Sequence, residues 1–191
     1  RCIFKCKNTD KICIFTDKGQ LHLLKVLDLP YGKFRDKGTP IDNVCNYDSK
    51  EENFVYITSL AHVSCSKVLF GTKQSMLKVV DGAELVVAKK TTAATKLMDE
   101  DEVLTVQVLD GDETLVMASV KDMFLRIEAG TIPEKKKGAV GVRGMKLNAG
   151  DALSHIYVLD GEREQTVEVK GKEVVLNRLH VGNRDTKGTK R

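Results

Sequence analysis

The feature that most constrains this chain is a repeat about fifty residues long. The turn at residues 16–19, Thr-Asp-Lys-Gly, returns at residues 72–75, at 119–122 and, more loosely, at 169–171. Each copy follows one apolar run and precedes another. A unit of this length holds only about four short strands and cannot bury its sheet alone, so neighbouring units must stack. The repeat therefore predicts a series of small sheets that share a continuous core.

Two further markers keep the same period. Basic residues followed by glycine end at Gly38, Gly138 and Gly188, which are 100 and 50 residues apart, and near residue 88 Lys89 and Lys90 keep the charge without the glycine. Residues 95–104 and 145–153 both place an apolar stop before an acidic turn. We predict one domain over residues 1–191 with approximate repeats 1–60, 61–110, 111–160 and 161–191, the last partial or completed by another strand.

Local composition predicts that these repeats are made of strands. Val, Ile, Leu and Thr occur in short runs broken by Gly, Asp, Asn or Lys, and no segment sustains the period of an amphipathic helix. The expected fold is an all-β, propeller-like pinwheel with about four sequential four-stranded blades, in an open or partial ring. The expected strands are residues 11–16, 20–27, 54–59, 67–71, 76–80, 103–109, 114–118, 123–128, 152–159, 165–169 and 173–179.

Cysteines and apolar runs predict the compartment. The five cysteines all lie in the first third of the chain, and an odd set of this kind fits reduced thiols better than a disulfide framework. No apolar run approaches the roughly 18 residues that span a bilayer. The chain begins without Met or a signal peptide. We therefore expect a fragment of a longer cytoplasmic protein that makes no use of a membrane.

The order of the markers is more specific than any one of them. A strand, Thr-x-x-Gly, a strand with Lys or Arg, a basic Gly turn and a closing Leu-x-x-Gly-Asp follow one another, most clearly at residues 15–19, 72–78, 123–126 and 141–151. This pattern resembles the C-terminal β-pinwheel domain of the DNA gyrase A subunit, which bacterial topoisomerase IV also carries in its equivalent subunit. The resemblance covers essentially the whole chain.

The resemblance implies a non-catalytic domain of a type IIA topoisomerase A subunit. Such a domain binds double-stranded DNA with little sequence preference and bends or wraps it around a basic outer rim. The rest of the A subunit is one implied partner and the ATPase B subunit is another, in the bacterial cytoplasm at the nucleoid. The domain itself is expected to hold no cofactor, and ATP and Mg²⁺ would act through other domains.

Two departures from the family pattern leave alternatives open. Gyrase members carry a box similar to Gln-Arg-Arg-Gly-Gly-Lys-Gly, and the nearest stretch in this chain is Phe34-Arg35-Asp36-Lys37-Gly38. The chain also has fewer repeats than gyrase members usually have. A gyrase-like and a topoisomerase IV-like parent both remain open, and a closed ring is not assumed.

The repeated basic turns are the predicted DNA contacts. Net charge is only +4, from 31 basic and 27 acidic residues, so attraction to DNA must come from the arrangement of charge. Lys and Arg neutralise phosphates without reading sequence. The turns supply Lys33, Arg35, Lys37, Lys89, Lys90, Lys135, Lys136, Lys137, Arg184 and Lys187, and a second row is expected at Lys78, Arg126 and Arg178, with Arg143 beside it.

Other kinds of site are poorly supported by the sequence. The acidic run Asp99 to Glu102 lacks the alternating ligands and the glycine of a calcium loop. Cys2 and Cys6 have no second pair at zinc spacing, and no histidine stands in a recognisable nucleophile motif. We therefore expect no catalytic and no metal-binding residue. The alternative function is a protein-interaction module of propeller type, which would use an apolar or mixed face and would not bind DNA.

Overall fold

Each repeat begins with a two-stranded hairpin. The computed structural model describes residues 4–191. The hairpin turns at Gly19, Ser75 and Asp122 have φ of 72°, 65° and 61°, the left-handed conformation that explains the turn marker in the sequence. The four hairpins are β1 (Lys11–Thr16) with β2 (Gln20–Lys25), β4 (Lys67–Thr72) with β5 (Met76–Asp81), β8 (Thr114–Ser119) with β9 (Met123–Glu128), and β12 (Thr166–Val169) with β13 (Lys172–Val175).

Two more strands complete each of the first three sheets. The third strand lies beside the first strand of the hairpin, and these strands are β3 (Phe54–Ser59), β7 (Val103–Leu109) and β11 (Leu153–Leu159). The fourth strand lies beside the second and comes from the following repeat; these strands are β6 (Thr91–Ala93), β10 (Val142–Arg143) and β14 (Thr189–Lys190). The sheet orders are β3-β1-β2-β6, β7-β4-β5-β10 and β11-β8-β9-β14, all antiparallel, with β12-β13 as a two-stranded fourth sheet. Each of the first three sheets thus takes its fourth strand from the following repeat, and this pairing joins neighbouring repeats.

This architecture confirms the predicted all-β pinwheel fold. The expected strands are present with small changes at their ends. β2 and β13 end earlier than expected, because the 3-10 helices η1 (Val26–Asp28) and η5 (Leu176–Arg178) follow them directly. The remaining helical pieces are η2 (Ile41–Asn43), α1 (Leu60–Ser64), η3 (Gly82–Leu85) and η4 (Ala129–Thr131). Between residues 4 and 191, no helix is long and apolar enough to cross a membrane.

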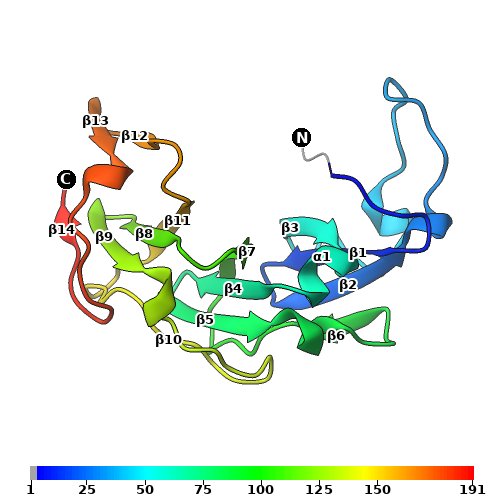
Figure 1. Cartoon of the computed structure of the whole chain (residues 1–191), viewed down its shortest axis with the longest axis horizontal. Helices are drawn as coiled ribbons and strands as arrows, with labels where there is room; N and C mark the ends of the chain where they lie inside the picture. The colour runs from blue at the N-terminus through cyan, green and yellow to red at the C-terminus, as the bar shows by residue number, and fades with distance from the viewer. Residues whose placement is uncertain (1–3) are drawn as a thin grey trace.

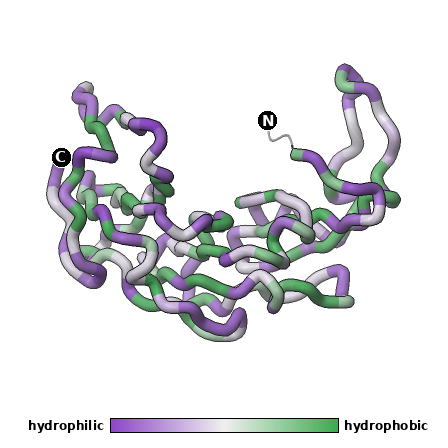
Figure 2. Tube along the Cα trace, viewed as in Figure 1, coloured by the Kyte–Doolittle hydropathy of each residue, from purple (hydrophilic) through white to green (hydrophobic). Residues whose placement is uncertain are grey.

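Apolar side chains fill the spaces between successive sheets. Phe15 of the first sheet and Phe70 of the second meet edge to face, with ring centroids 5.9 Å apart. Leu77 and Met117 belong to the cluster between the second and third sheets, and Val116 lies in the cluster between the third sheet and the last hairpin. Figure 2 shows apolar stretches along the stacked strands and hydrophilic stretches in the projecting loops. The sheets therefore hold one another in a row.

The row of sheets is a crescent (Figure 1). Because the strand order is the same in each complete sheet, β3, β7 and β11 share one edge, and β6, β10 and β14 share the other. The edge formed by β6, β10 and β14 follows the convex side of the crescent in Figure 1. A long segment between β2 and β3 projects from the N-terminal end, and the β12–β13 hairpin stands at the opposite tip.

Candidate nucleic-acid interface

The repeated strand order brings three of the predicted basic turns to one edge. Each of the loops between β5 and β6, β9 and β10, and β13 and β14 crosses to the convex side before its short strand pairs (Figure 1). These loops and strands carry Lys89, Lys90, Lys135, Lys136, Lys137, Arg143, Arg184 and Lys187. Residues far apart in sequence thus lie along one edge of the row of sheets, which we call the convex edge.

Exposure along the convex edge differs between its members. Lys89, Lys90, Lys136, Arg143 and Lys187 are exposed, and the side chain of Lys136 is 86% exposed. The turn at residues 135–137 also contains two half-buried lysines, and Arg184 is half-buried with its guanidinium donating to the carbonyl of Arg143 at 3.0 Å. The convex edge therefore carries both exposed and half-buried cations.

Two of these cations already have carboxylate neighbours. Lys136 lies 3.0 Å from Glu84, and Arg143 lies 3.4 Å from Asp185. The backbone N–H of Lys137 and then the ammonium of Lys136 lower the pKa of Glu84, while the hydrogen bond to Glu84 raises the pKa of Lys136. Exposed ion pairs of this kind are worth about 0–1 kcal/mol. A phosphate can replace such a carboxylate at small cost.

The first predicted basic turn has a different setting. Lys33, Arg35 and Lys37 are exposed on the projecting segment between β2 and β3, which pairs with no strand among the described residues. Tyr31 on the same segment is 97% exposed. Gly38 has φ of 77°, in the left-handed region. This segment is not continuous with the convex edge in Figure 1.

Lys78 is a correction to the predicted second row. Its side chain is buried at 1% exposure, and its ammonium donates to the carbonyls of Lys136, Lys137 and Ala139 at 3.1, 2.8 and 2.7 Å. It also lies 5.8 Å from the ring centroid of Phe70. Burial lowers the pKa of Lys78 to about 8. Lys78 cannot reach a phosphate from this position, because the turn that it holds lies between it and solvent.

Arg126 is not equivalent to Lys78, contrary to the prediction. Lys78 pairs with Phe70, which faces the first sheet, whereas Arg126 pairs with Val116, which faces the last hairpin. The half-buried Arg126 guanidinium donates to Thr114 Oγ1 at 3.0 Å and to the carbonyls of residues 177 and 179. The one-residue difference in register places the two cations on opposite sheet faces.

Arg178, the remaining member of the predicted second row, is exposed and lies 3.2 Å from Glu164. It stands on η5, outside the sheets that hold Lys78 and Arg126. The structure therefore does not form a second row of cations from these three residues.

The glycine register also needs correction. Gly141 and Gly188 directly precede β10 and β14, and a Cβ at these positions would lie 2.6 Å from the Leu77 carbonyl oxygen and 2.9 Å from that of Phe124. Gly138 has no atom within 4 Å of such a Cβ, and its φ is not in the left-handed region. Gly141 is therefore the structural equivalent of Gly188. Glycine is required at both positions because the chain approaches the preceding sheet too closely for a side chain just before β10 and β14 pair with it.

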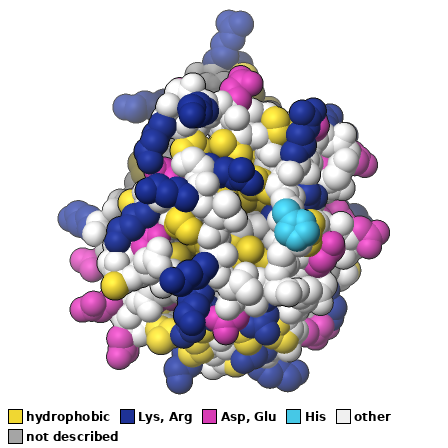
Figure 3. All heavy atoms as spheres, turned by 90° about the vertical axis from the view of Figure 1, so that its left-hand side faces the viewer, with side chains coloured by type: hydrophobic (Ala, Val, Ile, Leu, Met, Phe, Trp, Pro, Cys, Tyr) yellow, Lys and Arg dark blue, Asp and Glu magenta, His cyan; other side chains and the backbone are white. Residues whose placement is uncertain are grey.

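Sequence reasoning missed basic residues at the C-terminal tip. Figure 3 shows Lys and Arg side chains spread over this end of the molecule. Lys172, Lys190 and Arg191, which were not predicted, line a cavity of about 450 Å³ beside β13 together with the predicted Arg178. Lys170, in the hairpin turn, lies 2.5 Å from Asp122. Lys170 and Lys172, on either side of Gly171 in the last hairpin, were the available sequence signal.

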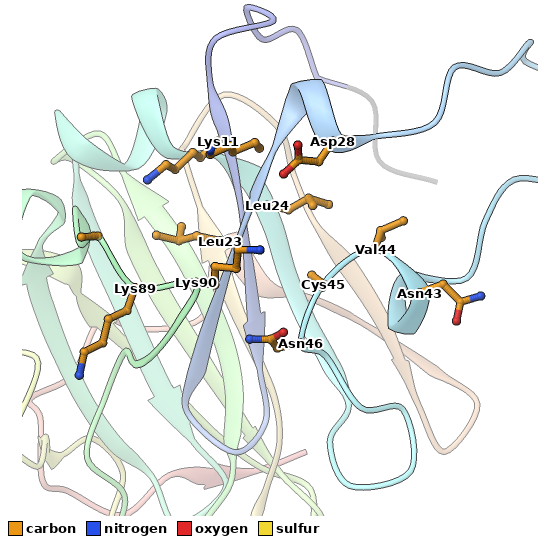
Figure 4. A pocket seen from close by; sticks show the side chains of 12 residues that line it. Lys11, Leu23, Leu24, Asp28, Asn43, Val44, Cys45, Asn46, Lys89 and Lys90 are labelled. Atoms are coloured by element: carbon orange, nitrogen blue, oxygen red, sulfur yellow. The ribbon is translucent and has the colours of Figure 1, made fainter.

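A second cavity lies at the N-terminal end of the convex edge. It has a volume of about 420 Å³ and lies between β1, β2, the segment at residues 43–46 and the turn that carries Lys89 and Lys90 (Figure 4). Lys11 and Lys25 also line it, and Asp28 is its acidic residue. The first basic turn of the convex edge is thus bordered by a cavity whose charged side chains are four lysines and one aspartate.

A buried polar network holds β6 against the first sheet beside this cavity. His22 Nε2 lies 2.6 Å from Glu52 Oε1, and both side chains are buried. His22 Nδ1 lies 3.0 Å from Thr91 Oγ1, which accepts a hydrogen bond from Asn46 Nδ2 at 3.2 Å. The network ties the start of β6, and hence the Lys89–Lys90 turn before it, to the first sheet.

Other site chemistry is sparse in the part of the chain that the structure describes. Over residues 4–191, no three His, Cys, Asp or Glu side chains gather where they could hold a metal ion. Burial raises the pKa of Cys13 to about 12, which makes this thiol unreactive.

Known sequences resemble this chain over nearly its whole length. Residues 66–110 and 113–160 match the family described as DNA gyrase C-terminal domain, beta-propeller. The DNA gyrase A subunit of Lawsonia intracellularis is 28% identical over 190 residues, which are 95% of this chain and 23% of that protein. The DNA gyrase A subunit of Staphylococcus epidermidis is 26% identical over 189 residues, with 95% and 21% covered. The chain thus spans about a fifth of the length of these relatives.

Solved structures share the fold. A C-terminal domain of DNA topoisomerase IV superposes with a TM-score of 0.86 at 22% identity, covering 95% of this chain and 58% of that one. The E. coli ParC C-terminal domain gives 0.81 at 18% identity, covering 100% and 80%, and a DNA gyrase A C-terminal domain gives 0.71 at 18%, covering 96% and 60%. Residues 66–110 and 113–160 are therefore repeats of the DNA gyrase C-terminal β-propeller family, within a chain that has the β-pinwheel fold of gyrase and topoisomerase IV C-terminal domains.

Proposed function

We propose that this chain binds double-stranded DNA along its convex edge and bends it, as a non-catalytic domain of a type IIA topoisomerase A subunit. The observation that carries the proposal is the convex edge, along which the repeated strand order brings the loops before β6, β10 and β14, each with lysine or arginine side chains. Backbone phosphates recur along a duplex, and a curved row of cations meets them only if the duplex bends. Bending a short site costs on the order of 1–6 kcal/mol, which several phosphate contacts can offset.

Binding of this kind carries little sequence information. Lys and Arg contact phosphate oxygens, which every sequence presents alike. The chain has no Trp and only 5% aromatic residues, which argues against the stacking surfaces that bind single strands. Duplex DNA of any sequence is the proposed ligand.

The names of the relatives support the wider setting that we propose. The domain would hold a duplex segment for a cleavage core located elsewhere in the parent protein, and an ATPase B subunit would be the further partner. ATP and Mg²⁺ would act through those other parts. The proposed location is the bacterial cytoplasm, at the nucleoid.

Fluorescence anisotropy with two unrelated 40-base-pair duplexes tests the proposal. We expect dissociation constants within about threefold of each other, since phosphate contacts do not depend on sequence. Energy transfer between dyes at the two ends of the duplex should rise on binding if the DNA bends. Tight binding to one sequence and none to the other would contradict phosphate recognition, and unchanged energy transfer would remove the bending part.

A protein-interaction role is the second candidate, and one observation favours it. Leu27, Tyr31 and Phe34 on the projecting segment are 71%, 97% and 82% exposed. Large exposed apolar side chains close in sequence are typical of partner surfaces. A module of that kind would not bind random duplex DNA in the anisotropy experiment.

A further inference from the structure

The turn that carries Lys135, Lys136 and Lys137 is held from inside the molecule. The Lys78 ammonium has three N–H donors, and it has three carbonyl acceptors, those of Lys136, Lys137 and Ala139, at 2.7–3.1 Å. Backbone carbonyls that would repel a phosphate are therefore turned toward the sheet. Of the three lysine side chains of the turn, that of Lys136 is exposed and those of Lys135 and Lys137 are half-buried.

Packing alone does not explain a lysine at position 78. Burying an ammonium without a carboxylate partner is unfavourable, and this burial lowers the pKa of Lys78. A methionine could fill the same apolar space beside Phe70 without that cost. The three hydrogen bonds to the turn offset the cost of burying this charge.

The opposite side of the turn is held by a carboxylate. Glu84 of η3 accepts from the backbone N–H of Lys137 at 3.1 Å and lies 3.0 Å from the ammonium of Lys136. Lys78 and Glu84 thus hold the turn backbone at residues 136, 137 and 139. Arg126 also donates to carbonyls of the following repeat, those of residues 177 and 179, but from the opposite sheet face.

We propose that Lys78 is a positioning residue for DNA binding, which from inside the second sheet shapes the turn that presents Lys135, Lys136 and Lys137 to the phosphate backbone. This inference rests on the proposed function. Lys78 touches no DNA itself and acts through the three carbonyls. The basic turn then behaves as a preformed site, which loses less entropy on binding than a free loop would.

A double-mutant cycle in the full chain tests this role. Lys78→Met should weaken binding to a random duplex by about five- to tenfold and reduce the slope of log affinity against log salt by about 1, the loss of one phosphate contact. Lys50→Met is the control, because Lys50 is exposed on the loop before β3 and its replacement removes the same net charge. It should change affinity by less than about twofold.

The cycle is completed with Lys135, Lys136 and Lys137 changed to Ala. In that background Lys78→Met should have less than about a twofold effect, because the turn through which it acts has lost its cations. An equal effect of Lys78→Met in both backgrounds would overturn the inference, as would a Lys78→Met variant that binds like Lys50→Met. If the triple replacement itself leaves binding unchanged, the use of this turn in the proposed function is wrong, whatever Lys78→Met does.

Amide hydrogen exchange of the unaltered protein gives an answer even if Lys78→Met does not fold. The Ala139 N–H donates to the Lys136 carbonyl at 3.0 Å, and the Asp36 N–H donates to the Lys33 carbonyl at 2.9 Å. The two turn hydrogen bonds are alike, but only the first turn is held by a buried cation. We expect Ala139 to exchange about tenfold more slowly than Asp36 after correction for intrinsic rates. Equal rates would overturn the inference.

Discussion

The basic turn at residues 135–139 and the projecting segment at residues 33–38 carry the same sequence marker in opposite structural settings. The first is followed by β10, which pairs with β5, and its carbonyls are bound by Lys78. The second is exposed along its length and joins no described sheet. A run of basic residues ending in glycine therefore identifies where a repeat turns. Whether that turn is a shaped surface depends on a neighbouring sheet that receives it.

The largest expected effect is on stability, at the point just before β10 where the chain meets the edge of the preceding sheet. Gly141→Ala should lower the free energy of unfolding by about 3 kcal/mol, because the added Cβ would lie 2.6 Å from the Leu77 carbonyl oxygen. Gly38→Ala should cost only about 1 kcal/mol, since its φ is positive but nothing lies near the added methyl. Urea denaturation measures both. Equal losses of stability in the two variants would contradict the distinction between a turn that is held against a neighbouring sheet and a turn that is not.

The next effect is on DNA affinity. Replacing Lys135, Lys136 and Lys137 by Ala should weaken binding to random duplex DNA by about 10- to 30-fold, as expected for the loss of two or three phosphate contacts. Replacing Lys33, Arg35 and Lys37 by Ala removes the same charge from the projecting segment and should cost only about threefold, because a free loop must be ordered on binding. Anisotropy titrations compare the two. A larger loss from the second triple variant would place the main contact on the projecting segment.

The smallest expected effect concerns an ionic contact between the first and second sheets. Glu102 accepts hydrogen bonds from Lys18 and Lys73 of two successive hairpin turns, and these contacts lower its pKa to about 2. Because the folded-state pKa is depressed below 4.5, the stabilisation is complete above pH 4.5 and is lost as pH falls toward 2.

Glu102→Gln should therefore lower the free energy of unfolding at pH 7 by about 0.5–1 kcal/mol, a small value because both lysines are about half exposed. The difference from the unaltered protein should nearly vanish at pH 2. Urea unfolding at the two pH values measures it. A difference that persists undiminished at pH 2 would show that the carboxylate charge is not its cause.

Much of the fold could be predicted from the sequence because the hairpins are local. Short apolar runs and a left-handed turn residue define β4 and β5, for example, without reference to the rest of the chain. The strands β6, β10 and β14 were not predicted, since two or three residues have no periodicity and pair only because the preceding repeat supplies an edge. The exchange of strands between repeats was unpredictable for the same reason.

The candidate site was predictable in its exposed turns but not in its interior. Lys89, Lys90, Lys136 and Lys187 are exposed as a charged turn residue should be. Lys78 was misassigned because lysine is almost always at the surface, although its place two residues before the buried Val80 was a signal that it faces inward. Gly138 was aligned with Gly188 by the spacing of the repeat, but three residues of loop length separate it from its true equivalent, Gly141.

The salt dependence of binding to a random-sequence duplex tests the central claim most directly. If the convex edge neutralises about four or five phosphates, log affinity should fall against log salt with a slope near −4, which is a loss of more than 100-fold between 50 and 200 mM salt. An affinity that barely changes over this range would contradict phosphate binding by the convex edge and would favour a protein-interaction surface.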